Sequence, residues 1–125
     1  MVRKRSEASD RVIVLTTAGS EEQSVEIAEA LVDRKLAACV NILPKIRSIY
    51  RWKNKIWDDE EFLLVIKTTR PAFPRVREAI KSIHSYELPE ILVLPLVDGD
   101  IGSLQWIGEC VNPATRPITE EESVR

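Results

Sequence analysis

The stretch KIRSIYRWKNKIWDDEEFLLVIKTT, residues 45–69, limits the folds that the rest of the chain can adopt. Its first part alternates like a strand, with Ile46, Ser48, Tyr50 and Trp52 on one face. KNK then forms a hairpin turn in which Asn54 can take a left-handed conformation. Residues 56–69 return as a second long strand, acidic in its middle and apolar at its end. Both strands are longer than a small sheet needs, so we predict that part of the hairpin projects beyond the core.

Strand and helix patterns alternate on both sides of this hairpin. Before it, the sequence predicts a strand at 12–15, a helix from about 21 to about 36 and a buried strand at 37–43. After it, the sequence predicts a helix within 68–85, a last strand at 91–97 and a short helix within 101–111. The order β-α-β-β-α-β plus a helix predicts an α+β fold, the ferredoxin-like split βαβ sandwich.

Local signals support these elements. Ser20 followed by Gln23 fits a capping box at the start of the first helix. Pro44 and Pro95 indicate edge strands or a bulge, because proline cannot donate a ladder hydrogen bond. The predicted buried stripe of the first helix is Val25, Ala28, Leu31, Val32 and Leu36. That of the second is Phe73, Val76, Ile80 and Ile83.

The totals predict one domain and exclude several classes of protein. With 125 residues, we expect a domain at 11–111, a disordered basic leader at 1–10 and a loose tail at 112–125. A net charge of −2 gives no argument for nucleic acid or a membrane as partner. Two cysteines without a CxxC motif fit a reducing, cytoplasmic setting. The chain has no P-loop and no nucleophile–base pair that we can assign, so we predict that it is not an enzyme.

The predicted sheet has helices on one face only, and the sequence gives the other face apolar residues. A bare apolar face, a projecting hairpin and proline-interrupted edges together predict an oligomer that covers this face. Trp52 and Trp57 flank the hairpin turn, and we expect them to anchor the interface between subunits.

The stretch SIHSYELPEI, residues 82–91, holds the only histidine of the chain, His84, with Glu87 and Glu90. Imidazole and carboxylates suit a divalent transition metal, or one end of a small polar ligand. Alternatively, His84 ends a helix, where a cation suits the dipole, and the glutamates are solvated. Residue chemistry alone leaves these readings open.

Two further residues carry functional chemistry. Cys39 would be a strong ligand for copper as a thiolate, but a lone buried cysteine is more often a small hydrophobic residue. Lys67 ends an apolar strand, where its head is either solvated, paired with Glu87 or Glu90, or bound to an anion.

The chain resembles the CutA family of divalent-cation tolerance proteins. The resemblance lies in LAACVN with the following proline and isoleucine (36–46), SIYRWKNKI (48–56), IKT (66–68), HSYELPEI (84–91) and LQWI (104–107). It covers residues 12–111. Asn54 stands where the family often has glycine, and extra cysteines used for copper binding in some relatives have no counterpart here.

The resemblance implies a tight homotrimer, shaped like the PII signalling proteins, in which long hairpins pair between subunits. It implies a role in tolerance of divalent metal ions, copper above all, with no obligatory cofactor and with Cu²⁺ or another divalent ion as the ligand. The metal residues that it implies are His84, Glu87, Glu90 and Cys39; Trp52, Lys67 and Tyr86 would line intersubunit clefts. The alternatives are a PII-like trimer that binds a small anion or metabolite in those clefts, and a scaffold for a partner protein.

Overall fold

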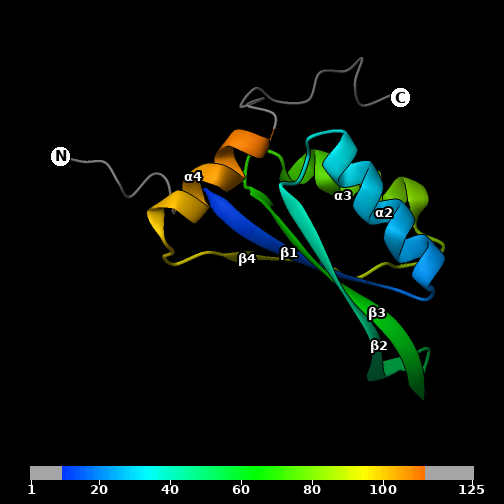
Figure 1. Cartoon of the computed structure of the whole chain (residues 1–125). Helices are drawn as coiled ribbons and strands as arrows, with labels where there is room; N and C mark the ends of the chain where they lie inside the picture. Colours follow the sequence, from blue (N-terminus) through cyan, green and yellow to red (C-terminus); the bar gives the residue numbers. More distant parts are fainter. Residues whose placement is uncertain (1–9, 112–125) are drawn as a thin grey trace.

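Figure 1 shows the computed structural model of the chain, which describes residues 10–111. The predicted leader, apart from Asp10, and the predicted tail lie outside the described residues, so both stay predictions. The elements are β1 (Arg11–Ala18), α2 (Glu21–Asp33), β2 (Cys39–Trp52), β3 (Lys55–Thr69), α3 (Phe73–Ile83), β4 (Ile91–Pro95) and α4 (Ile101–Cys110).

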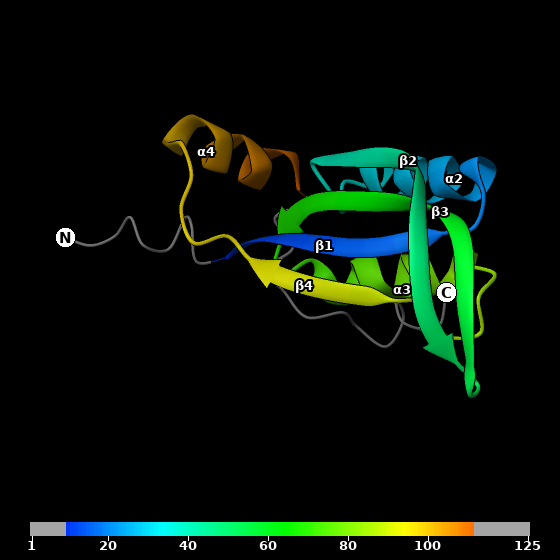
Figure 2. The same cartoon turned by 90° about the horizontal axis from the view of Figure 1, so that it is seen from below.

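The four strands form one antiparallel sheet in the order β2-β3-β1-β4. Helices α2 and α3 lie side by side on one face of this sheet (Figure 1), and Figure 2 shows the other face without a helix over it. The predicted α+β class and the predicted order of strands and helices are confirmed. No helix within residues 10–111 combines the length and the apolar character needed to span a membrane.

The core lies between the sheet and the two helices. Strands β1 and β3 contribute alternate residues to it, and α2 and α3 each contribute one stripe. Its fully buried members include Val12, Val14, Leu64 and Ile66 from the strands and Ile27, Leu31, Val76 and Ile80 from the helices. The alternate strand residues therefore point to the face that no helix covers.

The predicted stripe of the first helix was partly wrong. The buried residues of α2 are Ser24, Ile27 and Leu31, whereas Val25 and Val32 are exposed. Each of these valines follows a buried residue by one position, a rotation of about 100° around the helix axis, which carries it off the core face. The helix is also shorter than predicted: it ends at Asp33, and Lys35 takes a left-handed φ of 59°.

The boundaries of several other elements also differ from the prediction, and β1, at Arg11–Ala18, is longer than the predicted 12–15. The predicted strand at 37–43 and the first hairpin arm are one strand, β2, because a bulge between Leu43 and Ile46 lets the ladder continue. Helix α3 begins only at Phe73, since the threonines before it belong to β3. Strand β4 ends at Pro95, two residues early. The predicted stripe of α3 is confirmed, with Val76 and Ile80 fully buried.

The structure confirms the predicted cap of the first helix and the predicted hairpin turn. The Ser20 hydroxyl accepts a hydrogen bond from the backbone N–H of Gln23, which caps α2. Lys53 and Asn54 join β2 to β3 with φ values of 53° and 65°, the left-handed pair that a two-residue hairpin turn requires. The end of the hairpin turns away from the rest of the sheet, on the side without helices (Figures 1 and 2).

Candidate functional site

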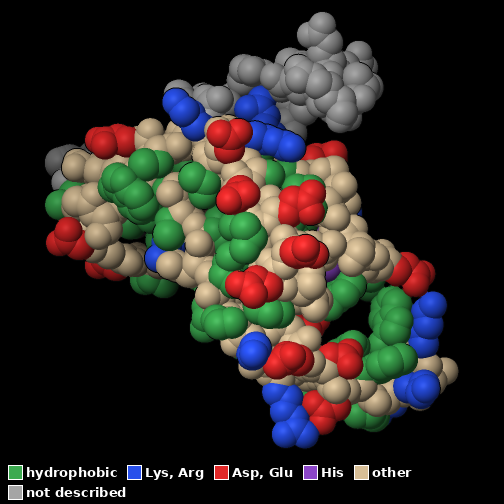
Figure 3. Space-filling model, turned by 45° about the vertical axis from the view of Figure 1, so that its right-hand side comes forward, with side chains coloured by type: hydrophobic (Ala, Val, Ile, Leu, Met, Phe, Trp, Pro, Cys, Tyr) green, Lys and Arg blue, Asp and Glu red, His purple; other side chains and the backbone are tan. Residues whose placement is uncertain are grey.

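A cleft of about 720 Å³ lies between the end of the hairpin and the loop that joins α3 to β4. We call it the hairpin cleft. It is lined by Thr17, Ser48, Ile49, Tyr50, Trp52, Glu61, Tyr86, Glu87, Leu88, Pro89, Glu90, Ile91 and Leu92. Figure 3 shows the surface hollowed between the end of the hairpin and the body of the molecule, with hydrophobic side chains around the hollow.

Two local features of the chain create the hairpin cleft. Pro44 and Lys45, which has a φ of 57°, lie in the bulge of β2, and a bulge bends its strand and increases its twist. On the other side, α3 ends at Ile83, and a proline such as Pro89 disfavours helical geometry in the residue before it. The bend carries the hairpin away from the sheet, and the loop after α3 forms the facing wall.

A buried carboxylate lies in the hairpin cleft. Glu61 is only 6% exposed, and its Oε2 accepts a hydrogen bond of 2.7 Å from the hydroxyl of Tyr86. Burial and this bond raise the pKa of Tyr86 well above its ordinary value. The Tyr86 hydroxyl also lies close to Gly19, where a Cβ atom would be 2.9 Å away. Gly19 therefore leaves the space that lets Tyr86 reach Glu61.

His84 holds the loop that carries Tyr86. Its Nε2 is 2.6 Å from the carbonyl oxygen of Thr17, and its Nδ1 is 3.1 Å from the backbone nitrogen of Tyr86. Because a carbonyl only accepts and a backbone N–H only donates, Nε2 carries the proton and Nδ1 is the acceptor. The centroids of the His84 and Tyr86 rings lie 4.6 Å apart. Both ring nitrogens are thus occupied in positioning the loop, and neither has a lone pair free for a metal ion.

The entrance of the hairpin cleft has charges of both signs. Lys53 Nζ at the hairpin turn is 3.3 Å from Glu87 Oε1, so this exposed ion pair joins the hairpin to the facing loop. The same ammonium lies 5.5 Å from the centre of the Trp52 ring. Glu90 adds a second carboxylate to the lining.

Cys39 and Lys67 lie elsewhere. They are opposite each other in the β2–β3 ladder, and Lys67 also pairs with Ile13 of β1. Ile13 is four residues before Thr17, a distance along the strand of roughly 14 Å. The Cys39 thiol contacts Asn41 Oδ1 at 3.7 Å. Seven residues were singled out in the sequence. Four of them line the hairpin cleft: Trp52, Tyr86, Glu87 and Glu90. The other three, His84, Cys39 and Lys67, do not.

One chain does not bring the expected metal ligands together. Within residues 10–111, no three His, Cys, Asp or Glu side chains are placed to hold a metal ion. His84 has both nitrogens engaged, and Cys39 lies at another part of the sheet. A metal site made from these residues would therefore need groups from a second subunit, and it stays a prediction.

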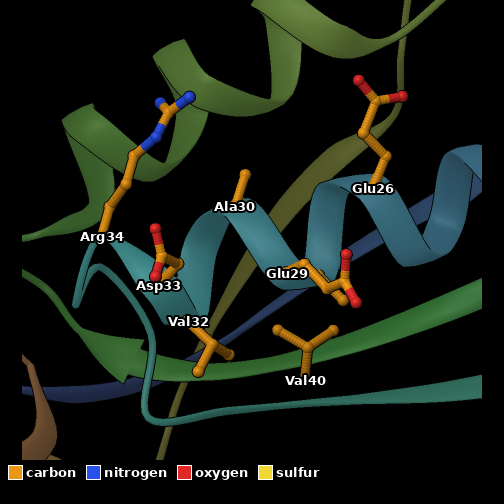
Figure 4. A pocket seen from close by; sticks show the side chains of 8 residues that line it. Glu26, Glu29, Ala30, Val32, Asp33, Arg34 and Val40 are labelled. Carbon is orange, nitrogen blue, oxygen red and sulfur yellow. The ribbon is translucent and has the colours of Figure 1, made fainter.

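A second hollow, of about 810 Å³, lies on the outer side of α2, next to Val40 of β2. Figure 4 shows that Glu26, Glu29 and Asp33 point in different directions along the helix rather than toward a common centre. Nothing in this hollow resembles the buried carboxylate of the hairpin cleft, so we regard the hairpin cleft as the candidate site.

Sequence reasoning missed Glu61 and Thr17 as parts of the site. The sequence shows an acidic run at 58–61, but no feature of the neighbouring residues distinguishes Glu61 from the three acidic residues before it. The alternation of β3 was a usable signal, since it places Glu61 on the same face as Leu63 and Val65. The burial of Glu61 depends on Tyr86, which is 25 residues away in the sequence.

Comparison with known proteins identifies the family. The family model described as CutA1 divalent ion tolerance protein matches residues 12–110. The chain belongs to the CutA1 family. The resemblance that was deduced from the sequence is thereby confirmed, and the family is one of proteins for tolerance of divalent ions.

The relatives within the CutA1 family include bacterial, plant and animal proteins. The divalent-cation tolerance protein CutA of Thermus thermophilus is 48% identical over 97 residues, which are 78% of this chain and 94% of that protein. Human protein CutA is 41% identical over 103 residues, 82% of this chain but only 58% of the human protein. The chain thus spans little more than half the length of that relative.

Solved structures of the CutA1 family share the fold. The structure of the Thermus thermophilus protein has a TM-score of 0.80 at 46% identity. The superposed part is 82% of this chain and 99% of the Thermus chain. The structure of CutA1 from Oryza sativa has a TM-score of 0.81 at 34% identity. The superposed part is 85% of this chain and 97% of the Oryza chain.

Proposed function

We propose that this chain acts in tolerance of divalent metal ions as a cytoplasmic homotrimer of ferredoxin-like subunits. It binds Cu²⁺ or another divalent ion weakly and catalyses no reaction. The observation that carries the proposal is the acidic hairpin cleft, in which Glu61, Glu87 and Glu90 line one hollow of a CutA1-family chain. Carboxylate oxygens and a neighbouring imidazole are suitable ligands for divalent metals.

Weak binding follows from the state of the ligands. His84 joins a metal site only after it gives up its hydrogen bond to Thr17 or to Tyr86. Glu87 is already paired with Lys53. Each of these interactions competes with the metal, and further ligands must come from another subunit. The proposal therefore couples metal binding to assembly.

The uncovered face of the sheet supports the assembly. It carries apolar residues from all four strands, which alternate with the core residues, and a few polar residues such as Asn41 and Lys67. The apolar residues are Ile13, Leu15, Leu43, Leu63, Val65, Leu92 and Leu94. Leu43, Leu92 and Leu94 are between 42% and 51% exposed in the single chain. A largely apolar surface of this kind is typical of a protein–protein interface.

The test is native mass spectrometry of the full chain during a copper titration at neutral pH. We expect a trimer that takes up three ions over a narrow concentration range. His84→Ala should weaken copper binding by about tenfold or more without dissociating the trimer. Glu60→Gln is the control, because Glu60 is an exposed carboxylate of β3 that lies outside the cleft lining.

Two results would contradict this proposal. A trimer that stays free of metal would rule out direct binding, and tolerance would then be an indirect effect. Unchanged copper affinity in His84→Ala would exclude His84 as a ligand.

The alternative of a small anion in the cleft gains no support from the geometry. The lining carries three carboxylates, and Lys67, the residue expected to hold an anion, lies outside it. A scaffold role is likewise favoured by no feature of the described residues.

A further inference from the structure

Five cationic side chains lie at one end of the molecule, where α2 ends and α3 begins. They are Arg34, Lys35, Arg70, Arg75 and Arg77, and we call this group the basic end. Residues 34–35 and 70–77 contain no aspartate or glutamate. Figure 3 shows Lys and Arg side chains at the upper end of the molecule, away from the hairpin. A surface of this composition attracts carboxylates.

Hydrogen bonds bring the segments of the basic end together. The hydroxyl of Thr68 donates to the carbonyl of Leu36 at 2.6 Å, which joins the loop after α2 to the end of β3. The backbone N–H of Arg70 donates to the carbonyl of Asp10 at 2.6 Å, which joins the turn before α3 to the start of β1. The two cations before Leu36 therefore lie at the same end of the sheet as the three cations after Thr68.

The basic end is not neutralised by the described residues. Four of its members are exposed and form no ion pair within the described chain: Arg34, Lys35, Arg70 and Arg77. The Arg77 guanidinium lies 5.2 Å from the centre of the Phe73 ring, beside the first turn of α3. That turn has no acidic residue, and its N-cap makes no side-chain hydrogen bond. Because a helix N-terminus carries partial positive charge, α3 adds to the attraction for carboxylates.

The proposed assembly leaves the basic end accessible. Helices α2 and α3 lie on the face of the sheet opposite to the uncovered face (Figures 1 and 2). The hairpin turn is at the far end of the strands, since β3 begins at Lys55 next to the turn and ends at Thr69 next to Arg70. An interface formed by the uncovered face and the hairpin therefore does not cover these cations.

The described chain ends beside the basic end. Val111, its last residue, is buried, and the preceding turn of α4 places Gly108 directly over the guanidinium of Arg11. Arg11 is paired in the sheet with Thr69, the residue before Arg70. The residues that follow Val111 in the sequence therefore start close to the five cations.

These following residues carry the complementary charge. Residues 120–122 are three consecutive glutamates. Glu120 follows Val111 by nine positions, a reach of up to about 30 Å for extended chain. Helix α3, with 11 residues, is only about 16 Å long. Single ion pairs on a surface are weak, but attachment to the same chain gives the glutamates an effective concentration of millimolar order.

We propose that Glu120, Glu121 and Glu122 bind to the basic end of their own chain and block it against other anions. Their carboxylates pair with its exposed cations and with the N-terminus of α3. The segment 112–125, predicted from the sequence to be loose, is then held at this point. The contact is separate from metal tolerance, because it uses no residue of the hairpin cleft and no metal ion.

The test compares ¹H–¹⁵N spectra of the full chain and two triple variants at low ionic strength in EDTA. The first variant changes residues 120–122 from Glu to Gln, and we call it the tail variant. The control changes Glu21, Glu22 and Glu26 to Gln, which removes the same charge near the opposite end of α2. We expect the backbone signals of Arg34, Lys35 and residues 70–77 to shift in the tail variant and to stay in place in the control.

Salt gives a readout that requires no variant. Exposed ion pairs are screened in about 1 M NaCl, where the Debye length is roughly 3 Å. In the full chain, salt should shift the signals of the basic end toward their positions in the tail variant. The tail variant itself should respond less to salt. Signals of the basic end that are the same in the full chain and the tail variant, or that shift equally in both triple variants, would overturn the proposal.

A second titration tests whether an external anion occupies the basic end instead. The probe is tripolyphosphate, measured by calorimetry with the full chain and the tail variant. If the glutamates block the basic end, the tail variant should bind tripolyphosphate about three- to tenfold more tightly than the full chain. Equal affinity would show that the basic end is open to external anions, which would contradict the proposal. Copper is absent from all of these measurements, so its binding remains a separate result.

Discussion

Tyr50 and Tyr86 are the only tyrosines in the chain, and each donates its hydroxyl proton to a carboxylate of β3. The distance is 2.5 Å from Tyr50 to Asp59 and 2.7 Å from Tyr86 to Glu61. The hydrogen bond to Asp59 raises the pKa of Tyr50 to about 12. Burial, and then the bond to Glu61, raise the pKa of Tyr86 further. At the scale of single residues, the ionisation of the Tyr50 hydroxyl therefore depends on a contact within the hairpin. The ionisation of the Tyr86 hydroxyl depends on a contact in the hairpin cleft.

These shifts predict the alkaline titration of the native protein. An unfolded tyrosine ionises near pH 10, so a raised native pKa adds stability that is fully present below about pH 10 and is lost as pH rises. We expect absorbance of tyrosinate to appear near pH 10 in denaturant and only near pH 12 or above in the native protein. Tyr86→Phe leaves Tyr50 as the single reporter. Native tyrosinate at about pH 10 would show that these hydrogen bonds do not persist in solution.

At the scale of the elements, α4 depends on a buried arginine. Arg11 at the start of β1 is only 9% exposed, its Nε donates to the carbonyl of Leu104 at 2.7 Å, and it also pairs with Asp10. The guanidinium lies directly under Gly108, where a Cβ atom would overlap Nη2. Because glycine has no side chain, α4 can lie this close to β1. The close approach leaves Leu104 and Ile107 of α4 buried.

Gly108→Ala should therefore displace either α4 or the Arg11 side chain. We expect a loss of about 1–3 kcal/mol in the free energy of unfolding, the usual cost of an overpacked contact. Gly102→Ala is the control in the same helix, because its Cβ would meet only Asp100 Oδ2, at 3.3 Å. Urea denaturation at equal protein concentration measures both variants. Equal stability of the two variants would show that Arg11 moves aside without cost.

At the scale of the whole molecule, the two faces of the sheet are unequal. Helices α2 and α3 cover one face, and the opposite face, seen from the front in Figure 2, carries exposed leucines without a helix over it. The hairpin leaves the sheet on the same side (Figure 1). The uncovered face and the hairpin therefore lie on the same side of the subunit. We propose that other copies of the chain cover this side.

Charge on the uncovered face should weaken this assembly. Leu94→Arg places a cation on a β4 residue that is 47% exposed in the single chain. Val32→Arg is the control, because Val32 is similarly exposed, at 45%, but lies on α2 on the helix side. Light scattering after size-exclusion chromatography should show smaller species for Leu94→Arg and an unchanged trimer for Val32→Arg. A trimer that survives Leu94→Arg would place the interface elsewhere.

Much of the fold and part of the candidate site could be predicted from the sequence. Turn chemistry at Asn54, the cap at Ser20 and strand alternation determine the order of the elements, because these signals act between residues a few positions apart. Glu87 and Glu90 could be chosen as candidate residues from the chemistry of one short stretch, and Trp52 and Tyr86 from the resemblance to the CutA family. The structure places all four in one cleft.

The tertiary structure alone decided what these residues do. Tyr86 meets Glu61 across 25 positions, and His84 meets Thr17 across 67, so both contacts depend on strand register and on the bend at the bulge of β2. The same register separates Cys39 and Lys67 from His84. A local pattern lists the groups that could form a site. Only long-range packing determines which of them is buried, which is paired and which, like Glu61, has no cationic partner in the described chain.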